Sequence, residues 1–331
     1  MPAYRRSRKA DVVAVFDRNP DRAEELASFA RSKPYSGELS AMLANESLDA
    51  VSICTPPWLH APQTIEALEA DVNVLVEKPM AMTAEDSRRM CDAASRRGRT
   101  IAVSHNFLFS RAVAQASRRI AAGRAGRLES VVGFQMSTPR RRLPEWYETL
   151  PGQLFFDEAP HLTYLSRRFL GPGEPELVHA SAVQGDAHEV QRTQNVVAVL
   201  KGTTAMGVTT MTFNASRAEW GFAIVGSRES YLIDRFRDQL VVLGLGGAHT
   251  PGEVLRQTIG GIGQLTAGAI ALGGYSLATV SLWTDSSRRS WMVDRRQFRE
   301  RKGSGRSRCS RRFVVRPSSL HRAGPCERAS R

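Results

Sequence analysis

The chain has 331 residues and an apolar fraction of 42%, which is enough for the cores of about two globular domains and excludes a chain that is disordered throughout. Its net charge of +13 is typical of nucleic-acid-binding proteins, but residues 286–331 hold 14 Arg and one Lys against three acidic residues and carry +12 of it. Because no nucleic-acid reader motif accompanies this charge, we expect no specific nucleic-acid partner. Four Cys without a C-x-x-C pair, and a start without signal-peptide character, predict a cytoplasmic protein with no metal site.

The first part of the chain alternates between strand and helix patterns. Strands are expected at residues 11–16, 50–54, 72–76 and 100–103, and helices open at Asn19-Pro20-Asp21, cover 39–43 and 59–70, and run from the capping residue Thr83 to Gly98. Repeated strand–helix units of this length indicate an α/β fold with a parallel sheet covered on both faces. We assign residues 1–124 to this domain.

The pattern changes after Gly126. Longer strands are expected at residues 128–136, 177–183, 195–200, 204–213, 220–225, 230–233 and 239–243. Short turns separate them, which predicts an α+β domain over residues 125–285 with a large, mostly antiparallel sheet and a helix between Asp157 and Leu170. Residues 286–331 are rich in Arg and Ser and cannot form a core, so we expect an unfolded tail.

Residues 257–284 carry no charge and are long enough to cross a membrane. Gln257, Gln264 and six Gly dilute their hydrophobicity, however. A buried or interface helix is therefore favoured over a membrane span, and we expect no membrane partner.

Polar residues follow each strand of the first domain. Asp17 comes after the first strand, Thr55-Pro56-Pro57 and then His60 after the second, Glu77-Lys78-Pro79 after the third and His105-Asn106 after the fourth. Open α/β sheets bind ligands at the carboxyl ends of their strands, and an acid in this place can accept hydrogen bonds from both ribose hydroxyls. This arrangement is typical of dinucleotide binding.

Four segments carry a family resemblance. T-P-x-x-x-H at residues 55–60, A-L-E-A at 67–70, V-L-V-E-K-P-M-A at 74–81 and G-Q-L-F-F-D-E-A-P-H at 152–161 resemble the Gfo/Idh/MocA oxidoreductases, the relatives of glucose–fructose oxidoreductase and inositol dehydrogenase. The resemblance implies a Rossmann domain followed by a domain with a large open sheet that commonly forms oligomers. It also implies nicotinamide-dependent oxidation or reduction of sugars, cyclitols and related compounds.

The resemblance also implies roles for single residues. Lys78, Asp157 and His161 match the catalytic positions, while the expected cofactor-binding set comprises Asp17, Arg18, Thr55, Pro56, His60, Glu77, Lys78 and Asn106. Arg18 follows the ribose-binding acid and could accept a 2′-phosphate, which leaves NAD and NADP both open.

Elementary chemistry supports the catalytic set. Asp157 and His161 are four residues apart and share one face of a helix, where one can orient the other for acid–base work. Pro79 restricts Lys78 to extended geometry and so fixes the direction of its amine. The alternatives are a solvated lysine, a helix-capping acid and a structural histidine. His105, Trp146 and Tyr147 could line a substrate pocket or be structural, and the Arg run at residues 140–142 could hold an anion or be a solvated surface.

The sequence departs from the family pattern in three places. No G-x-G-x-x-G precedes Asp11, so the first Rossmann strand and its phosphate loop are expected to be missing, with two strands left unpaired and dinucleotide binding weak or absent. The Arg- and Ser-rich tail is atypical, and Tyr164 stands where the family often has Asp. Two other functions therefore stay open: a catalytically silent relative that binds dinucleotide or sugar, and nonspecific nucleic-acid binding by the tail.

Overall fold

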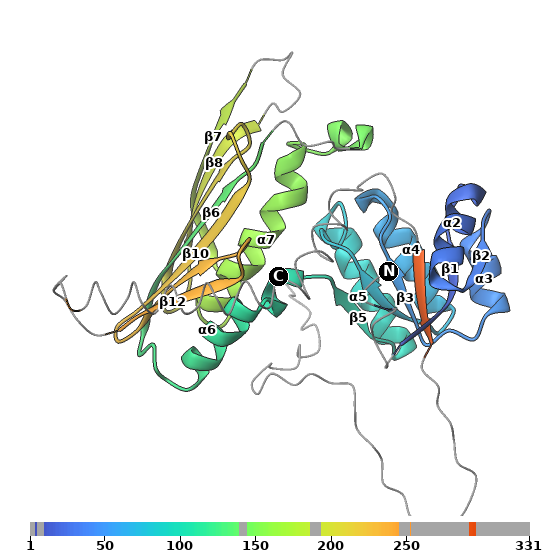
Figure 1. The fold of residues 1–331 in the computed structure, drawn as a ribbon, viewed down its shortest axis with the longest axis horizontal. Coiled ribbons are helices and arrows are strands. Elements are labelled where there is room, and N and C mark those ends of the chain that lie inside the picture. The colour runs from blue at the N-terminus through green and yellow to red at the C-terminus, as the bar shows by residue number, and fades with distance from the viewer. Residues whose placement is uncertain are drawn as a thin grey trace, which may run out of the picture. The chain divides into compact units, whose positions relative to one another are not determined.

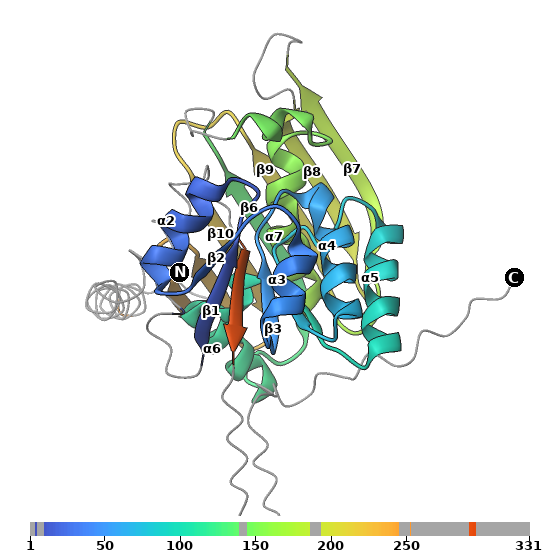
Figure 2. The same ribbon diagram turned by 90° about the vertical axis from the view of Figure 1, so that its right-hand side faces the viewer.

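The computed structural model describes residue 4 and residues 10–138, 144–185, 193–244, 252 and 291–295. The first domain is built on a six-stranded sheet, shown in Figure 2, in the order β2-β1-β13-β3-β4-β5. Its strands are β1 Asp11–Phe16, β2 Lys33–Tyr35, β3 Ala50–Ile53, β4 Asn73–Val76, β5 Ile101–Val103 and β13 Trp291–Arg295, and its helices are α2 Pro20–Ala30, α3 Leu39–Asn45, α4 Pro57–Glu69 and α5 Ala84–Arg97. The pairs β1–β2, β3–β4 and β4–β5 are parallel, as expected.

Local sequence signals explain these helices. The side chain of Asn19 accepts hydrogen bonds from the N–H groups of Asp21 and Arg22 at the start of α2. Thr83 accepts from Asp86 N at the start of α5, and Gly98 ends that helix at φ 60, in the left-handed region that glycine tolerates. Helix α4 packs against both α3 and α5, and α2 packs against β1 and β2.

Strand β13 lies between β1 and β3 and is antiparallel to both, as Figure 2 shows. It comes from the segment that we expected to be unfolded, so that expectation is wrong for Trp291–Arg295. The expectation that the neighbouring strands have no partner is also wrong, because β13 hydrogen-bonds along one edge of each. The uncharged segment 257–284 lies outside the described residues. Among the helices that are described, none has the length and apolar character needed to cross a membrane.

The second domain is a seven-stranded sheet in the order β12-β11-β10-β6-β9-β8-β7. Its strands are β6 Leu128–Met136, β7 Glu176–Gln184, β8 Thr193–Lys201, β9 Met206–Thr212, β10 Glu219–Gly226, β11 Ser230–Asp234 and β12 Gln239–Leu243. Strands β6 and β9 are parallel, and the other neighbours are antiparallel, which confirms the mostly antiparallel prediction.

Two helices cover one face of this sheet (Figure 1). Helix α7, Leu154–Phe169, packs on β6 and β9, whereas α6, Arg111–Ala121, packs on β11 and β12. At Gly133 an added Cβ would lie 3.0 Å from Leu162 Cδ2, so glycine allows α7 its close approach to β6. The core between helices and sheet includes Leu162, Phe213 and Tyr231.

The opposite face of the seven-stranded sheet carries exposed apolar side chains. They alternate with the buried residues along the strands and include Val132, Phe134, Met206, Val208 and Leu232. Side chains on one strand point alternately to the two faces, so these residues share a single apolar surface. Exposed apolar surface of this kind commonly marks an interaction site.

Sequence patterns missed β2 and α6 and placed the start of α4 two residues too late. Strand β2 has three residues, one of them Pro34, and so shows no alternation. Helix α6 does carry a signal, since Ser110 caps it by accepting from Val113 N.

Candidate functional site

Lys78 follows the end of β4 and is joined to Pro79 by a cis peptide bond. Its ammonium group donates hydrogen bonds to both the carboxylate Oδ1 and the backbone oxygen of Asp157, each at 2.7 Å. The two side chains are 5% and 0% exposed, so this is a buried ion pair. The sequence places these residues 79 positions apart, and the fold brings them into contact.

Tyr147 completes the environment of Asp157. It lies in the short 3-10 helix η2, Glu145–Thr149, and its hydroxyl donates to the other carboxylate oxygen, Oδ2, at 2.7 Å. Trp146 stacks on the Tyr147 ring and meets Trp58 of α4 edge to face at 5.4 Å. Both oxygens of Asp157 are therefore hydrogen-bonded, which a buried carboxylate requires.

His161 lies one turn after Asp157 on α7 and is fully buried. Its imidazole stacks on Phe107 with centroids 4.1 Å apart and meets Trp220 edge to face at 5.4 Å. Nδ1 is 2.7 Å from the Tyr164 hydroxyl. Burial, followed by the nearby charge of Lys78, holds the pKa of His161 well below its ordinary value, although Asp157 opposes the shift. The ring is therefore neutral near neutral pH.

Arg235 also contacts this aromatic group. Its guanidinium carbon is 4.2 Å from the centroid of the Phe107 ring, a cation–π contact. Burial lowers the pKa of Arg235, while Asp238 and Tyr164 raise it. The positive charge of Arg235 also contributes to the lowered pKa of His161.

The expected cofactor-binding residues lie at the carboxyl ends of the parallel strands. Asp17 follows β1, is 8% exposed and accepts a hydrogen bond from Asn19 N at 2.9 Å. Thr55 follows β3 and donates to Gln63 Oε1, whereas Arg18 is exposed. Glu77 accepts from Lys78 N at 3.3 Å, and Asn106 begins the 3-10 helix η1, Asn106–Phe109.

His60 is held differently from the other members of this set. Its Nδ1 is 2.8 Å from Pro79 O, its Nε2 is 2.8 Å from Thr55 O, and it is fully buried. Carbonyl oxygens only accept, so whichever ring nitrogen carries hydrogen donates to the oxygen beside it. His60 thus links Thr55, after β3, to Pro79, after β4. This link helps to position Lys78, the residue directly before Pro79.

These residues fit the ribose and nicotinamide parts of a dinucleotide. Asp17 offers a carboxylate at a strand end, and Lys78 stands at the end of β4. For the pyrophosphate, no glycine-rich loop can be assigned among the described residues at the start of β1, and the first described glycine is Gly37. No group of His, Cys, Asp and Glu within the described ranges could hold a metal ion.

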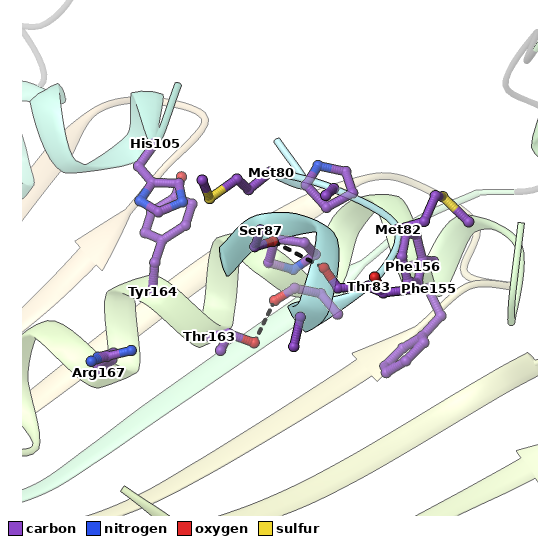
Figure 3. Close-up of a pocket in the computed structure, with 15 residues that line it drawn as sticks. Met80, Met82, Thr83, Ser87, His105, Phe155, Phe156, Thr163, Tyr164 and Arg167 are labelled. Carbon is purple, nitrogen blue, oxygen red and sulfur yellow. Dashed lines mark hydrogen bonds between the residues drawn. The ribbon is translucent and has the colours of Figure 1, made fainter. Parts of the chain in front are cut away.

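A pocket of about 470 Å³ is shown in Figure 3, and its lining includes Pro79, the residue after Lys78. It is bounded by the segment Pro79–Ala84, the first turn of α5 and one side of α7, and it includes Met80, Phe156, His105 and Tyr164. Lys78, Asp157 and His161 do not line it. The rings of His105 and Tyr164 stack at 4.2 Å, and burial lowers the pKa of His105.

Two contributors to the site, Phe107 and Arg235, have no assigned role in the sequence. For Tyr147 the sequence leaves two alternatives open, lining a substrate pocket or a structural role, and the structure places its hydroxyl on Asp157. Phe107 directly follows Asn106, a member of the expected cofactor-binding set, and Arg235 lies in a turn after β11. The position of Tyr164 three residues after His161 was the one available signal, because residues three apart on a helix are neighbours.

Comparisons with known proteins match both domains of the chain. A family model described as "Oxidoreductase family, NAD-binding Rossmann fold" matches residues 1–105, and one described as "GFO/IDH/MocA C-terminal domain" matches residues 113–232. The chain is 29% identical over 203 residues to 1-carboxy-3-chloro-3,4-dihydroxycyclo hexa-1,5-diene dehydrogenase of Comamonas testosteroni, covering 60% of the chain and 50% of that protein. It is 30% identical over 162 residues to the NAD(+)-dependent scyllo-inositol 2-dehydrogenase of Bacillus subtilis, covering 49% and 47%.

Solved structures show the same fold. The WlbA dehydrogenase of Bordetella pertussis, in complex with NADH and UDP-GlcNAcA, matches with a TM-score of 0.59 and 27% identity over 67% of the chain and 69% of that structure. A levoglucosan dehydrogenase in complex with NADH matches with a TM-score of 0.65 and 24% identity, covering 72% and 68%. The chain spans about half the length of the two curated relatives named above.

Proposed function

Because the chain belongs to the Gfo/Idh/MocA family of oxidoreductases, we propose that it transfers a hydride between NAD or NADP and a sugar, a cyclitol or a related hydroxy or keto compound. The observation that carries this proposal is the buried contact of Lys78 with Asp157, one helical turn from His161. A buried ion pair is costly unless it is well bonded, and pairs of this kind are often kept at functional sites.

Each residue has a distinct task in this proposal. When bound, the cofactor supplies or accepts the hydride. In the reductive direction the Lys78 ammonium gives a proton to the substrate carbonyl oxygen as the hydride reaches its carbon, and the resulting amine regains a proton from solvent. Asp157 holds the Lys78 side chain in one orientation, and His161 provides a second polar group beside it.

The cofactor is proposed to lie along the carboxyl ends of β1, β3 and β4. Asp17 would accept from the ribose hydroxyls, and Thr55 and Pro56 would contact the dinucleotide between its two ends. His60 would act by holding the segments on either side, since both of its ring nitrogens are bonded to backbone oxygens. If Arg18 accepts a 2′-phosphate, the cofactor is NADP; if it does not, the cofactor is NAD.

The apolar open face of the seven-stranded sheet supports a homo-oligomer. Val132, Phe134 and Val208 are 40%, 42% and 37% exposed in the single chain. Covering such a surface with a second copy removes apolar area from water, the main driving force of stable association.

A second candidate function is a catalytically silent relative that binds a dinucleotide or a sugar. The specific observation in its favour is β13, which lies antiparallel between β1 and β3 in a sheet whose other strand pairs are parallel.

The test combines binding with turnover. NADH and NADPH affinities are measured by cofactor fluorescence, and reduction of a panel of keto sugars and cyclitol ketones is then followed. We expect turnover that falls at least about 100-fold in K78M, the scale of lost general acid catalysis. K33M, at a lysine that is 68% exposed, is the matched control. Binding without turnover would favour the silent relative, and turnover unchanged in K78M would overturn the proposed role of Lys78.

A further inference from the structure

Tyr164 contacts His161 on the ring nitrogen Nδ1, at 2.7 Å. We propose that Tyr164 is a positioning residue: its hydroxyl donates its hydrogen to Nδ1 of His161, which fixes the imidazole as the tautomer with hydrogen on Nε2. The catalytic meaning of this inference rests on the proposed function, but the tautomer itself does not.

The argument starts from the hydroxyl, which has one hydrogen to give. Three groups surround it: Phe107 N at 3.2 Å, His161 Nδ1 at 2.7 Å and Asn106 Oδ1 at 3.5 Å. The N–H of Phe107 can only donate, so the tyrosine oxygen accepts there. The hydrogen of Tyr164 must then point to either His161 or Asn106.

Distance decides between these two acceptors. A good O–H hydrogen bond spans roughly 2.5–3.0 Å, which the contact with His161 satisfies and the contact with Asn106 does not. If Nδ1 carried the hydrogen, the tyrosine oxygen would accept twice and its own hydrogen would have only the long contact. A poorly bonded buried donor costs on the order of 1–3 kcal/mol. The arrangement with Tyr164 donating to Nδ1 avoids that cost at the Tyr164 hydroxyl.

Packing prevents the two rings from escaping this arrangement. The imidazole lies on Phe107 with an interplanar angle of 15°, and Trp220 closes its edge. The Tyr164 ring is stacked on His105 with an angle of 22°. Because both rings are clamped, neither can rotate to exchange its hydrogen-bonding partner without breaking aromatic contacts.

The surrounding charges favour neutral forms of both groups. Lys78 and Arg235 lower the pKa of His161, Asp157 raises it, and burial has the largest effect. His105, which faces Tyr164, also has a lowered pKa. Burial raises the pKa of Tyr164, so its hydroxyl keeps its hydrogen. A neutral imidazole with a hydrogen-bond donor at Nδ1 has its hydrogen on Nε2.

This tautomer determines which groups of the proposed site donate hydrogen bonds and which group transfers the proton. The Lys78 ammonium and the Nε2–H of His161 are both donors, so the resting protein is prepared to hold a carbonyl oxygen. His161 then donates a hydrogen bond without transferring its proton, and the transferred proton comes from Lys78. In the oxidative direction Nε2 already carries hydrogen and cannot accept the hydroxyl proton of a substrate, so Lys78 must first release one proton to solvent and then accept the hydroxyl proton as a neutral amine.

The decisive measurement is the ¹⁵N spectrum of histidine-labelled protein without cofactor or substrate. Comparison with H161Q assigns the His161 signals. We expect Nδ1 to show the shift of an unprotonated nitrogen and Nε2 that of a protonated one. In Y164F the ratio of the tautomers is expected to change by about tenfold, the equivalent of one hydrogen bond. Y35F, which removes another hydroxyl outside the site, should leave the ratio unchanged.

Two results would overturn the proposal: hydrogen on Nδ1 in the unsubstituted protein, or an unchanged ratio in folded Y164F. If Y164F does not fold, the spectrum of the unsubstituted protein still decides. The ¹⁵N measurement needs no turnover, so the tautomer result stands even if the proposed enzymatic function fails. A different tautomer would likewise leave the turnover test of the proposed function intact.

Discussion

The residues at the nicotinamide end of the proposed dinucleotide site and those at its adenosine end are held in place by different kinds of contact. Lys78 and Asp157 are 79 residues apart in sequence and form a buried ion pair that Tyr147 extends. Asp17, at the other end, accepts from Asn19, two residues away in its own turn. The groups proposed to handle protons thus depend on tertiary structure, whereas the acid proposed to bind the ribose depends on a local turn. Damage to the fold should therefore affect the first end before the second.

The largest effect is expected at Lys78. K78M leaves the buried carboxylate of Asp157 without its cation, which should lower the free energy of unfolding by about 3–5 kcal/mol. Chemical denaturation measures this, and K33M is the control on an exposed ion pair. The double variant K78M/D157N should recover part of the loss, because no buried charge remains. Additive losses would show that the two residues are not coupled.

The next effect tests the extension of the pair through Tyr147. Y147F removes a hydrogen bond to a fully buried carboxylate, and we expect a loss of about 1.5–3 kcal/mol in unfolding free energy. Y35F is a matched control, because the Tyr35 hydroxyl also donates to a carboxylate, that of Glu46, at 2.6 Å but in a less buried place. Equal losses of unfolding free energy in Y147F and Y35F would contradict the expectation that the buried hydrogen bond contributes more than the less buried one.

A smaller effect should appear in the pH dependence of stability. The pKa of His161 is lowered in the folded state, so the unfolded chain binds more protons below about pH 6.5. Stability from this group is present above that pH and falls below it, by at most about 1.4 kcal/mol per pH unit. Urea unfolding at pH 7.5 and 5.5 should show a smaller decrease for H161Q. The pKa of His105 is also lowered, so part of the decrease should remain.

The smallest effect is expected at the adenosine end. D17A removes one acceptor of a local backbone hydrogen bond and should cost about 0.5–1.5 kcal/mol of unfolding free energy. Its effect on dinucleotide affinity should exceed its effect on stability if Asp17 binds the ribose. Thermal unfolding and NADH titration of the same preparation test both statements. A loss as large as that of K78M would break the comparison between the two ends.

Sequence patterns predicted regular structure well where the residues themselves encode it. The caps at Asn19, Thr83 and Gly98 lie where expected, and the strand at residues 239–243 has the predicted bounds. Strand β13 could not be predicted, because nothing local in residues 291–295 indicates a place between β1 and β3. Pairing of this kind depends on which neighbours have free edges.

The site was predictable only in part. The spacing of Asp157 and His161 places them on one helical face, but their contacts with Lys78 and Phe107 join distant segments and have no local signature. The resemblance to a family supplied the candidates, and the structure supplied their partners. Tyr164 illustrates the limit: its position was visible in the sequence, but its contact with Nδ1 depends on the rotamers of packed rings.

The edge-to-face contact of Trp58 with Trp146 has a practical consequence. Trp58 belongs to the dinucleotide-binding half and Trp146 to the helix that carries Tyr147. Two indoles at 5.4 Å couple electronically, so their near-ultraviolet circular dichroism and emission should report any separation of these segments. The Trp58–Trp146 pair is therefore an intrinsic spectroscopic probe of ligand binding that needs no attached dye, and W58F is its control.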